Sequence, residues 1–148
     1  MKVVISDASC LILFTNLDRL DILKHIYSEI WVTSKVADEY GLSLPPFFSV
    51  RDPSDSSREQ SLLLELDSGE ASSIALALET DGCRIIIDEK KGRRVAFSLG
   101  LDVTGTIGIL LDASAKGLIF PDHGLLSTLD QCGFRLSERL KNLLVSGA

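Results

Sequence analysis

Short runs of β-branched residues alternate with helical segments along most of the chain. The first run is Val3–Ile5, and further candidate strands cover residues 29–33, 47–51, 84–89 and 101–106. Strands that alternate with helices favour a parallel sheet that is covered on both faces. Right-handed crossovers bring the carboxyl ends of such strands to one edge of the sheet. The sequence therefore predicts an α/β fold with about five parallel strands.

Helical spacing of apolar residues, together with capping signals, predicts the segments between these strands. Gly41 is a typical helix end, and Ser68 or Gly69 is the expected start of a later helix, with Gly69 also ending the helix before it. The predicted helices cover residues 8–16, 17–27, 34–40, 58–66, 70–79, 90–100, 107–116, 122–130 and 137–144. A chain of 148 residues has the size of one domain. We therefore expect a single domain over residues 1–148.

The composition, 45% hydrophobic and 24% charged, is that of a globular soluble protein. No apolar run approaches the ~20 residues that span a membrane, and no signal peptide is recognisable. We therefore expect a cytoplasmic protein that does not associate with a membrane. Cys10, Cys83 and Cys132 are scattered, which favours buried thiols in a reducing compartment over disulfides or zinc. The net charge of −6 argues against nucleic-acid binding through overall charge, although a local basic patch remains compatible with it.

Two aspartates directly follow buried strands. Asp7 ends the stretch that begins with Val3–Ile5, and Asp88 stands at the same place after the β-branched run Ile85–Ile87. Ligands of open α/β sheets bind at the carboxyl edge of the strands, so both acids are candidate site residues. The alternative for the first is structural, because Asp7 or Ser9 is also a favourable helix cap.

Two glutamates lie in helical turns that can lean over the same edge. They are Glu39 and Glu70, and their alternative role is a solvated face or a favourable charge near a helix N-terminus. Asp38 and Glu39 point in different directions, so we expect only one of them to face the cleft. Glu89 is the neighbour that could substitute for Asp88.

Several carboxylates in one cleft raise each other's pKa and require a cation. Oxygen ligands without cysteine or histidine suit Mg²⁺ or Mn²⁺. Two such ions about 4 Å apart activate a water molecule and stabilise the leaving oxygen in phosphodiester cleavage. A basic cluster behind Asp88 would hold phosphates, or is simply a solvated helix face; its residues are Lys90, Lys91, Arg93 and Arg94.

Five short segments occur in an order that is itself informative. They are Val4–Ser9, Val36–Tyr40, Leu66–Ala71 followed by residues 74–77, Ile86–Lys90 with Arg93 and Arg94, and Val103–Thr106. Together they resemble the PIN-domain family, in particular prokaryotic predicted nucleic-acid-binding proteins related to the ribonuclease toxins of toxin–antitoxin pairs. The resemblance covers about residues 2–120, which leaves closing helices at about 121–146.

This resemblance implies a three-layer α/β/α Rossmann-like sandwich with a metal-dependent ribonuclease activity. It implies four acids that are both catalytic residues and ligands of Mg²⁺ or Mn²⁺: Asp7, Glu39, Glu70 and Asp88. Polar residues that resemble those lining the site are Ser9, Thr104 and Thr106. Many toxin relatives carry aspartate where this chain has Glu70. Glutamate is longer by one methylene group, which changes the position from which its carboxylate would contact the metal.

The sequence features are compatible with three functions. The first is a ribonuclease that cleaves single-stranded or structured RNA, as the toxin of a type II pair whose cognate antitoxin inserts a peptide into the cleft. The second is a non-catalytic PIN-like module that binds RNA or a protein. The third, a phosphoacceptor or nucleotide-binding domain, lacks a glycine-rich loop after the first strand. A homodimer is also expected, with the apolar stretches 17–27 and 107–118 as candidate surfaces.

Overall fold

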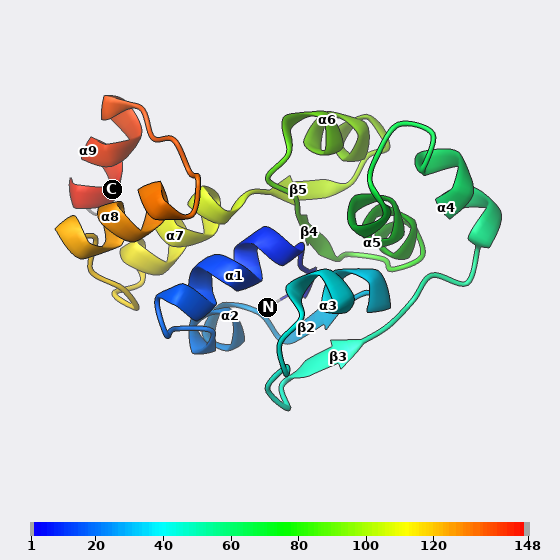
Figure 1. Ribbon diagram of the computed structural model, residues 1–148, viewed down its shortest axis with the longest axis horizontal. Helices are drawn as coiled ribbons and strands as arrows, with labels where there is room; N and C mark the ends of the chain where they lie inside the picture. Colours follow the sequence, from blue (N-terminus) through cyan, green and yellow to red (C-terminus); the bar gives the residue numbers. More distant parts are fainter. Residues whose placement is uncertain (1, 147–148) are drawn as a thin grey trace.

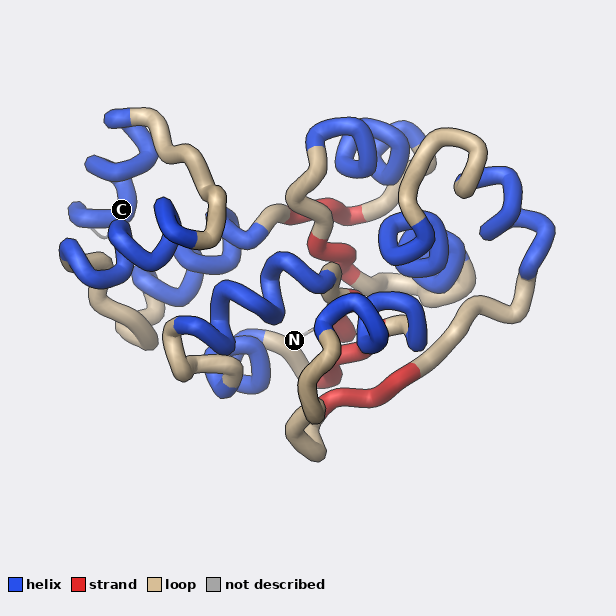
Figure 2. The backbone as a smooth tube through the Cα atoms, viewed as in Figure 1, coloured by secondary structure: helices blue, strands red, loops and turns tan. Residues whose placement is uncertain are grey.

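The computed structural model describes residues 2–146, which form one parallel sheet with helices on both sides (Figure 2). Its strands are β1 (Val3–Ile5), β2 (Glu29–Val32), β3 (Phe48–Val50), β4 (Arg84–Ile86) and β5 (Asp102–Thr104). They lie in the order β3-β2-β1-β4-β5, and every neighbouring pair is parallel. The prediction of a three-layer α/β sandwich with about five parallel strands is confirmed.

Helices connect the strands and close the chain. They are α1 (Ala8–Asn16), α2 (Asp21–Ile26), α3 (Ser34–Tyr40), α4 (Ser56–Leu62), α5 (Ser68–Leu78), α6 (Lys90–Ser98), α7 (Thr106–Ala115), α8 (His123–Gln131) and α9 (Glu138–Ser146). Figure 1 shows α4, α5 and α6 grouped on one side of the sheet, while α7, α8 and α9 lie together at the opposite end of the view. Each helix lies where an alternating α/β chain must place it, between consecutive strands or after the last one.

The strands supply two apolar cores because their side chains alternate between the two faces of the sheet. Val4 and Ile86 pack with residues of α1, α2 and α7 in one core. Ile5 and Ile85 pack with residues of α5 and α6 in the other. Since both faces of the two central strands are covered, a ligand can reach these strands only at their ends. In open α/β sheets ligands bind at the carboxyl ends.

Local signals explain why several predicted boundaries agree with the structure. The predicted segments 8–16 and 34–40 are α1 and α3. The Thr33 hydroxyl accepts from Val36 N at 3.2 Å, and Gly41 ends α3 with φ at 75°. The candidate strand at 47–51 contains β3, which is a terminal strand of the sheet.

Other boundaries differ for identifiable reasons. The predicted helix 17–27 is shortened to α2 because Asp18 takes a positive φ of 55° and breaks the helical path. α4 begins earlier than predicted, since the Asp55 carboxylate accepts from Arg58 N at 3.1 Å and caps it there. The prediction that Gly69 ends a helix is wrong: α4 ends at Leu62, and Gly69 lies inside the first turn of α5.

The two stretches offered as dimer surfaces are already used inside the chain. Ile22 and Leu23 of the first, and Ile109 and Leu110 of the second, are buried in the same core. Much of their apolar character therefore reflects the protein's own packing. Within residues 2–146, every helix is too short or too polar to span a bilayer.

Candidate acidic site

Asp7 and Asp88 meet at the carboxyl ends of the two neighbouring strands β1 and β4. The Asp7 carboxylate caps α1 by accepting from Cys10 N at 3.0 Å. Its other oxygen accepts from the backbone N–H of Asp88 at 3.1 Å. The structural and the functional interpretations of Asp7 are therefore compatible, because one carboxylate caps the helix and also contacts the second acid.

Hydroxyl groups fix the orientation of Asp88. Thr106 donates twice, from its backbone N–H to Oδ1 at 2.7 Å and from its hydroxyl to Oδ2 at 2.6 Å. Ser9 Oγ lies 2.6 Å from Asp88 Oδ2 and 3.1 Å from Asp7 Oδ2. A serine hydroxyl carries a single proton, so it serves one of the two acids at a time. The pair consequently has fewer donors than two ionised carboxylates would use.

Burial and mutual repulsion act on this pair. Burial, and secondly the negative charge of Asp88, raise the pKa of Asp7 to about 7. Neither aspartate forms an ion pair with a lysine, arginine or histidine in the part of the chain that is described. The Cys10 thiol lies in the first turn of α1, which Asp7 caps. Burial and then the charges of Asp7 and Asp88 raise the pKa of this thiol well above its ordinary value. Among the described residues, the pair therefore concentrates negative charge without an ion pair to balance it.

A hollow of about 190 Å³, the acidic pocket, opens beside Asp7. Its lining residues are Asp7, Ala8, Ser9, Val36, Glu39, Asp67, Gly69, Glu70 and Glu89. Glu70 comes from the first turn of α5, as the sequence predicted. Glu39 comes from the last turn of α3, whereas an N-terminal turn was expected. Asp38 does not line the pocket, which agrees with the expectation that only one of the two adjacent acids faces it.

Glu70 is the least satisfied of these acids. Its Oε2 is buried and has no hydrogen-bond partner among the described residues. Burial, followed by repulsion from Asp67 and Glu89, raises the pKa of Glu70 to about 7. The helix α6 approaches this side chain so closely that a Cβ at Gly92 would stand 2.6 Å from Oε2. Glycine at position 92 thus leaves room for the carboxylate.

Asp67 is a member of the pocket that the sequence interpretation missed as a candidate. It caps α5 by accepting from Glu70 N at 2.8 Å. Burial and then the charge of Asp67 raise the pKa of Glu39. The available signal was the spacing of Asp67 and Glu70, which is that of a helix-capping aspartate followed by an acid in the first turn.

The structure separates the predicted substrate-binding residues into three groups. Lys90, Lys91, Arg93 and Arg94 are exposed on α6, directly after Asp88 and Glu89. Thr106 is fully buried behind Asp88, so it positions that carboxylate and is withdrawn from any substrate. Ser9 is half-buried in the pocket wall.

The expectation that Thr104 lines the acidic site is not met. Thr104 lines another hollow, together with Tyr27, Arg84 and Asp112. Side chains alternate along a strand, and Val103, which is one residue earlier, packs into the opposite core with α5 and α6. Thr104 therefore faces the side of the sheet covered by α7.

The donor chemistry of the pocket fits a divalent metal ion in two respects. All the polar side chains are carboxylates or hydroxyls, the ligands that Mg²⁺ and Mn²⁺ prefer. Glu70 Oε2 is a buried acceptor without a partner, and such atoms are rare unless water or an ion completes them. Among the described residues, however, no three acidic, histidine or cysteine side chains are gathered closely enough to hold one ion. Direct contact by one or two carboxylates, completed by water, is the arrangement compatible with these positions.

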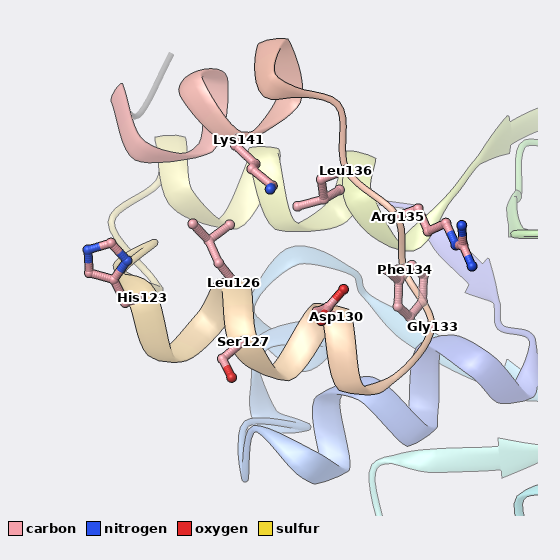
Figure 3. Close-up of a pocket in the computed structure, with 9 residues that line it drawn as sticks. All are labelled: His123, Leu126, Ser127, Asp130, Gly133, Phe134, Arg135, Leu136 and Lys141. Atoms are coloured by element: carbon pink, nitrogen blue, oxygen red, sulfur yellow. The ribbon is translucent and has the colours of Figure 1, made fainter.

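A larger hollow of about 720 Å³, the C-terminal hollow, lies between α8 and α9. Its lining residues are His123, Leu126, Ser127, Asp130, Gly133, Phe134, Arg135, Leu136 and Lys141. In Figure 3 Lys141 points from α9 toward α8, and the leucines lie between the two helices. The wall mixes basic, acidic and apolar groups, and it contains none of the predicted site residues.

One comparison with known proteins is informative. A family model described as a PIN domain matches residues 3–148, which is nearly the whole chain. No curated protein matches the chain.

Proposed function

Since the chain belongs to the PIN-domain family, which implies a nuclease-like fold and interaction with nucleic acid, we propose that it is a metal-dependent endoribonuclease. The centre of the reaction is the pair Asp7 and Asp88, with Glu39 and Glu70 facing it from two helices. The predicted Mg²⁺ or Mn²⁺ is the cofactor, and an RNA phosphodiester is the substrate.

The observation that carries this proposal is the uncompensated charge of the aspartate pair. Two acids share one serine hydroxyl, and burial raises the pKa of Asp7 to about 7. A partly buried acid pair of this kind lowers the stability of the fold unless a cation neutralises it. Retaining such a pair at the ligand-binding edge of a parallel sheet is understandable if the pair binds a metal.

Asp7 and Asp88 would hold the ion, and Glu39 and Glu70 would complete its surroundings directly or through water. When bound, the ion supplies an activated water nucleophile and stabilises the leaving oxygen. The chain's own groups prepare this chemistry. Thr106 and Ser9 hold the Asp88 carboxylate in one orientation. Glu70 Oε2, which has no hydrogen-bond partner among the described residues, is available to accept a hydrogen bond from water in the pocket.

The test is cleavage of RNA with Mg²⁺ or Mn²⁺, with EDTA as the metal-free control. We expect Asp7→Asn to abolish cleavage while the fold survives, because asparagine caps a helix as well as aspartate does. The matched control is Asp122→Asn. Asp122 caps α8 by accepting from Leu125 N at 2.9 Å, but it lies outside the acidic pocket. If the Asp7 and Asp122 variants retained the same activity on a broad RNA panel, the catalytic proposal would be wrong.

The biological setting remains part of the proposal. The family resemblance supports a toxin of a type II pair, restrained by a cognate antitoxin that enters the acidic pocket. Free cysteines at positions 10, 83 and 132 support a reducing, cytoplasmic location. A homodimer stays a prediction. Growth arrest on expression, relieved by a co-expressed neighbouring gene, tests the toxin assignment.

A further inference from the structure

The helix α6 presents an unusual exposed face, which we call the α6 outer face: Lys90, Lys91, Arg93, Arg94 and Phe97. Lys90, Arg94 and Phe97 are spaced i, i+4 and i+7, so they lie along one line of the helix. Gly92 and Ala96 are buried and form the opposite, inner face. The α6 outer face therefore combines positive charge with an aromatic ring.

The four cations of this face are unpaired. None of them forms an ion pair with a carboxylate among residues 2–146. Elsewhere many cations are paired, for example Lys2 with Asp102 and Lys116 with Asp112. In a chain with a net charge of −6, four neighbouring cations without acidic partners form a local positive field. Phosphate groups are the natural counter-ions of such a field.

Phe97 adds an exposed aromatic ring to this positive face. Its side chain is 77% exposed, so it contributes little to the apolar core of the protein. Aromatic side chains beside a basic groove bind single-stranded nucleic acid because bases stack on the ring while cations hold the backbone. A duplex offers its phosphates to the same cations, but its bases are already stacked on each other.

The α6 outer face is continuous with the acidic site. Lys90 begins α6 two residues after Asp88. Arg93 Nη1 and Asp88 Oδ1 both lie next to Gly105, each 3.1 Å from the position of a Cβ at that residue. Phe97 follows Lys90 by seven residues, or roughly 10 Å along the helix axis. A strand of RNA that follows α6 from the acids therefore reaches Phe97 a short distance from the cleavage point.

We propose that the α6 outer face binds single-stranded RNA and that Phe97 stacks on an unpaired base beside the scissile phosphate. Phe97 is then a specificity-determining residue that makes unpaired RNA a better substrate than duplex RNA. The inference rests on the proposed function only for the place of cleavage. Binding itself is measured separately.

The experiment compares the affinity of the full chain for three probes in EDTA, where metal-dependent cleavage is arrested. The probes are a short single-stranded RNA, a duplex of the same sequence and a single strand that lacks bases. Phe97→Ala is expected to weaken binding of the base-containing single strand about 10-fold, because stacking on one aromatic ring is worth ~1–3 kcal/mol. Its affinity for the duplex and the base-free strand stays unchanged, and Phe97→Trp restores tight binding.

Phe120→Ala is the matched control, since Phe120 is 82% exposed but lies between α7 and α8. Arg94→Ala separates charge from stacking. It should weaken binding of all three probes and lower the salt dependence on the single strand by about 0.7 in logarithmic slope.

Two results would overturn the inference. One is equal affinity of Phe97→Ala and Phe120→Ala for the single strand. The other is conversion of a wild-type dimer into a monomer by Phe97→Ala with RNA binding intact, because the face would then be a protein interface. The failure of the nuclease proposal is distinct: wild-type protein would bind single-stranded RNA through Phe97 and leave it uncut with either metal.

Discussion

The acidic pocket and the C-terminal hollow differ in size and in charge, and the two differences point in opposite directions. The C-terminal hollow is about 720 Å³ and the acidic pocket about 190 Å³. The larger one carries charges of both signs, and its Lys141 pairs with Glu138 at 3.6 Å. The smaller one is lined by five acids and no cation. The comparison teaches that volume measures loose packing between elements, whereas uncompensated charge identifies a place where a ligand is needed.

The strongest test of this comparison replaces Asp88, which contacts the pocket residue Asp7 but does not itself line the acidic pocket, and one aspartate of the C-terminal hollow. Asp88→Asn should lower the rate of RNA cleavage by about 10³-fold, because a lost metal-held charge removes several kcal/mol of transition-state stabilisation. Asp130→Asn, in the wall of the C-terminal hollow, should leave the rate unchanged. Single-turnover kinetics with saturating Mn²⁺ measure both. Equal losses from the two variants would remove the distinction between the regions.

A smaller effect is expected from the hydroxyl that orients Asp88. Thr106→Val keeps the shape of the side chain but removes the donor 2.6 Å from Asp88 Oδ2, and leaves that oxygen with one partner fewer. The loss in metal affinity or in kcat should be about 10- to 100-fold. Thr106→Ser should recover most of it.

Ser127→Ala is the counterpart in the C-terminal hollow and should have no effect on cleavage. Metal titrations followed by activity show whether the Thr106 effect lies in affinity. If Thr106→Val changed thermal stability but left metal affinity and kcat unchanged, Thr106 would be a purely structural residue.

The sequence predicted most of the acids of the site, because short-range signals determine the strands and helices that carry them. Asp7 and Asp88 follow buried strands, and a parallel sheet brings such positions together irrespective of side-chain detail. Glu39 and Glu70 followed from the same topology and from the family resemblance, and the structure places both in the pocket wall with Asp7.

The remaining features depend on side-chain direction and long-range packing. The face of β5 on which Thr104 lies is set by register, which a run of three residues does not reveal. The burial of Thr106 depends on how α7 docks against Asp88. The close approach of α6 at Gly92, and the unpartnered Glu70 oxygen beside it, likewise arise only when two distant helices are packed.

The acids of the site also make the stability of the protein depend on pH. The pKa of Asp7 is raised from 3.8 to about 7 in the folded protein. Between these values the folded state keeps a proton that the unfolded chain has lost, so the free energy of unfolding falls as pH rises. Without metal, Asp7 alone should lower the free energy of unfolding by about 2 kcal/mol between pH 5.5 and 8, from 1.36 kcal/mol for each pH unit below its folded pKa.

Urea unfolding in EDTA at several pH values measures this slope. Asp7→Asn should make the slope shallower, because the variant has no proton to lose at this position, whereas Asp130→Asn in the C-terminal hollow should reproduce the wild-type slope. Glu70, whose pKa burial also raises to about 7, leaves a residual slope of the same sign in the Asp7 variant.

Adding Mn²⁺ at pH 8 should restore the lost stability in the wild type and less so in Asp7→Asn, because the ion replaces the proton as the partner of the acids. A wild-type protein whose stability rises between pH 5.5 and 8 in EDTA would show that the acid pair is balanced within the chain, and the basis for expecting a cation in the smaller hollow would be lost.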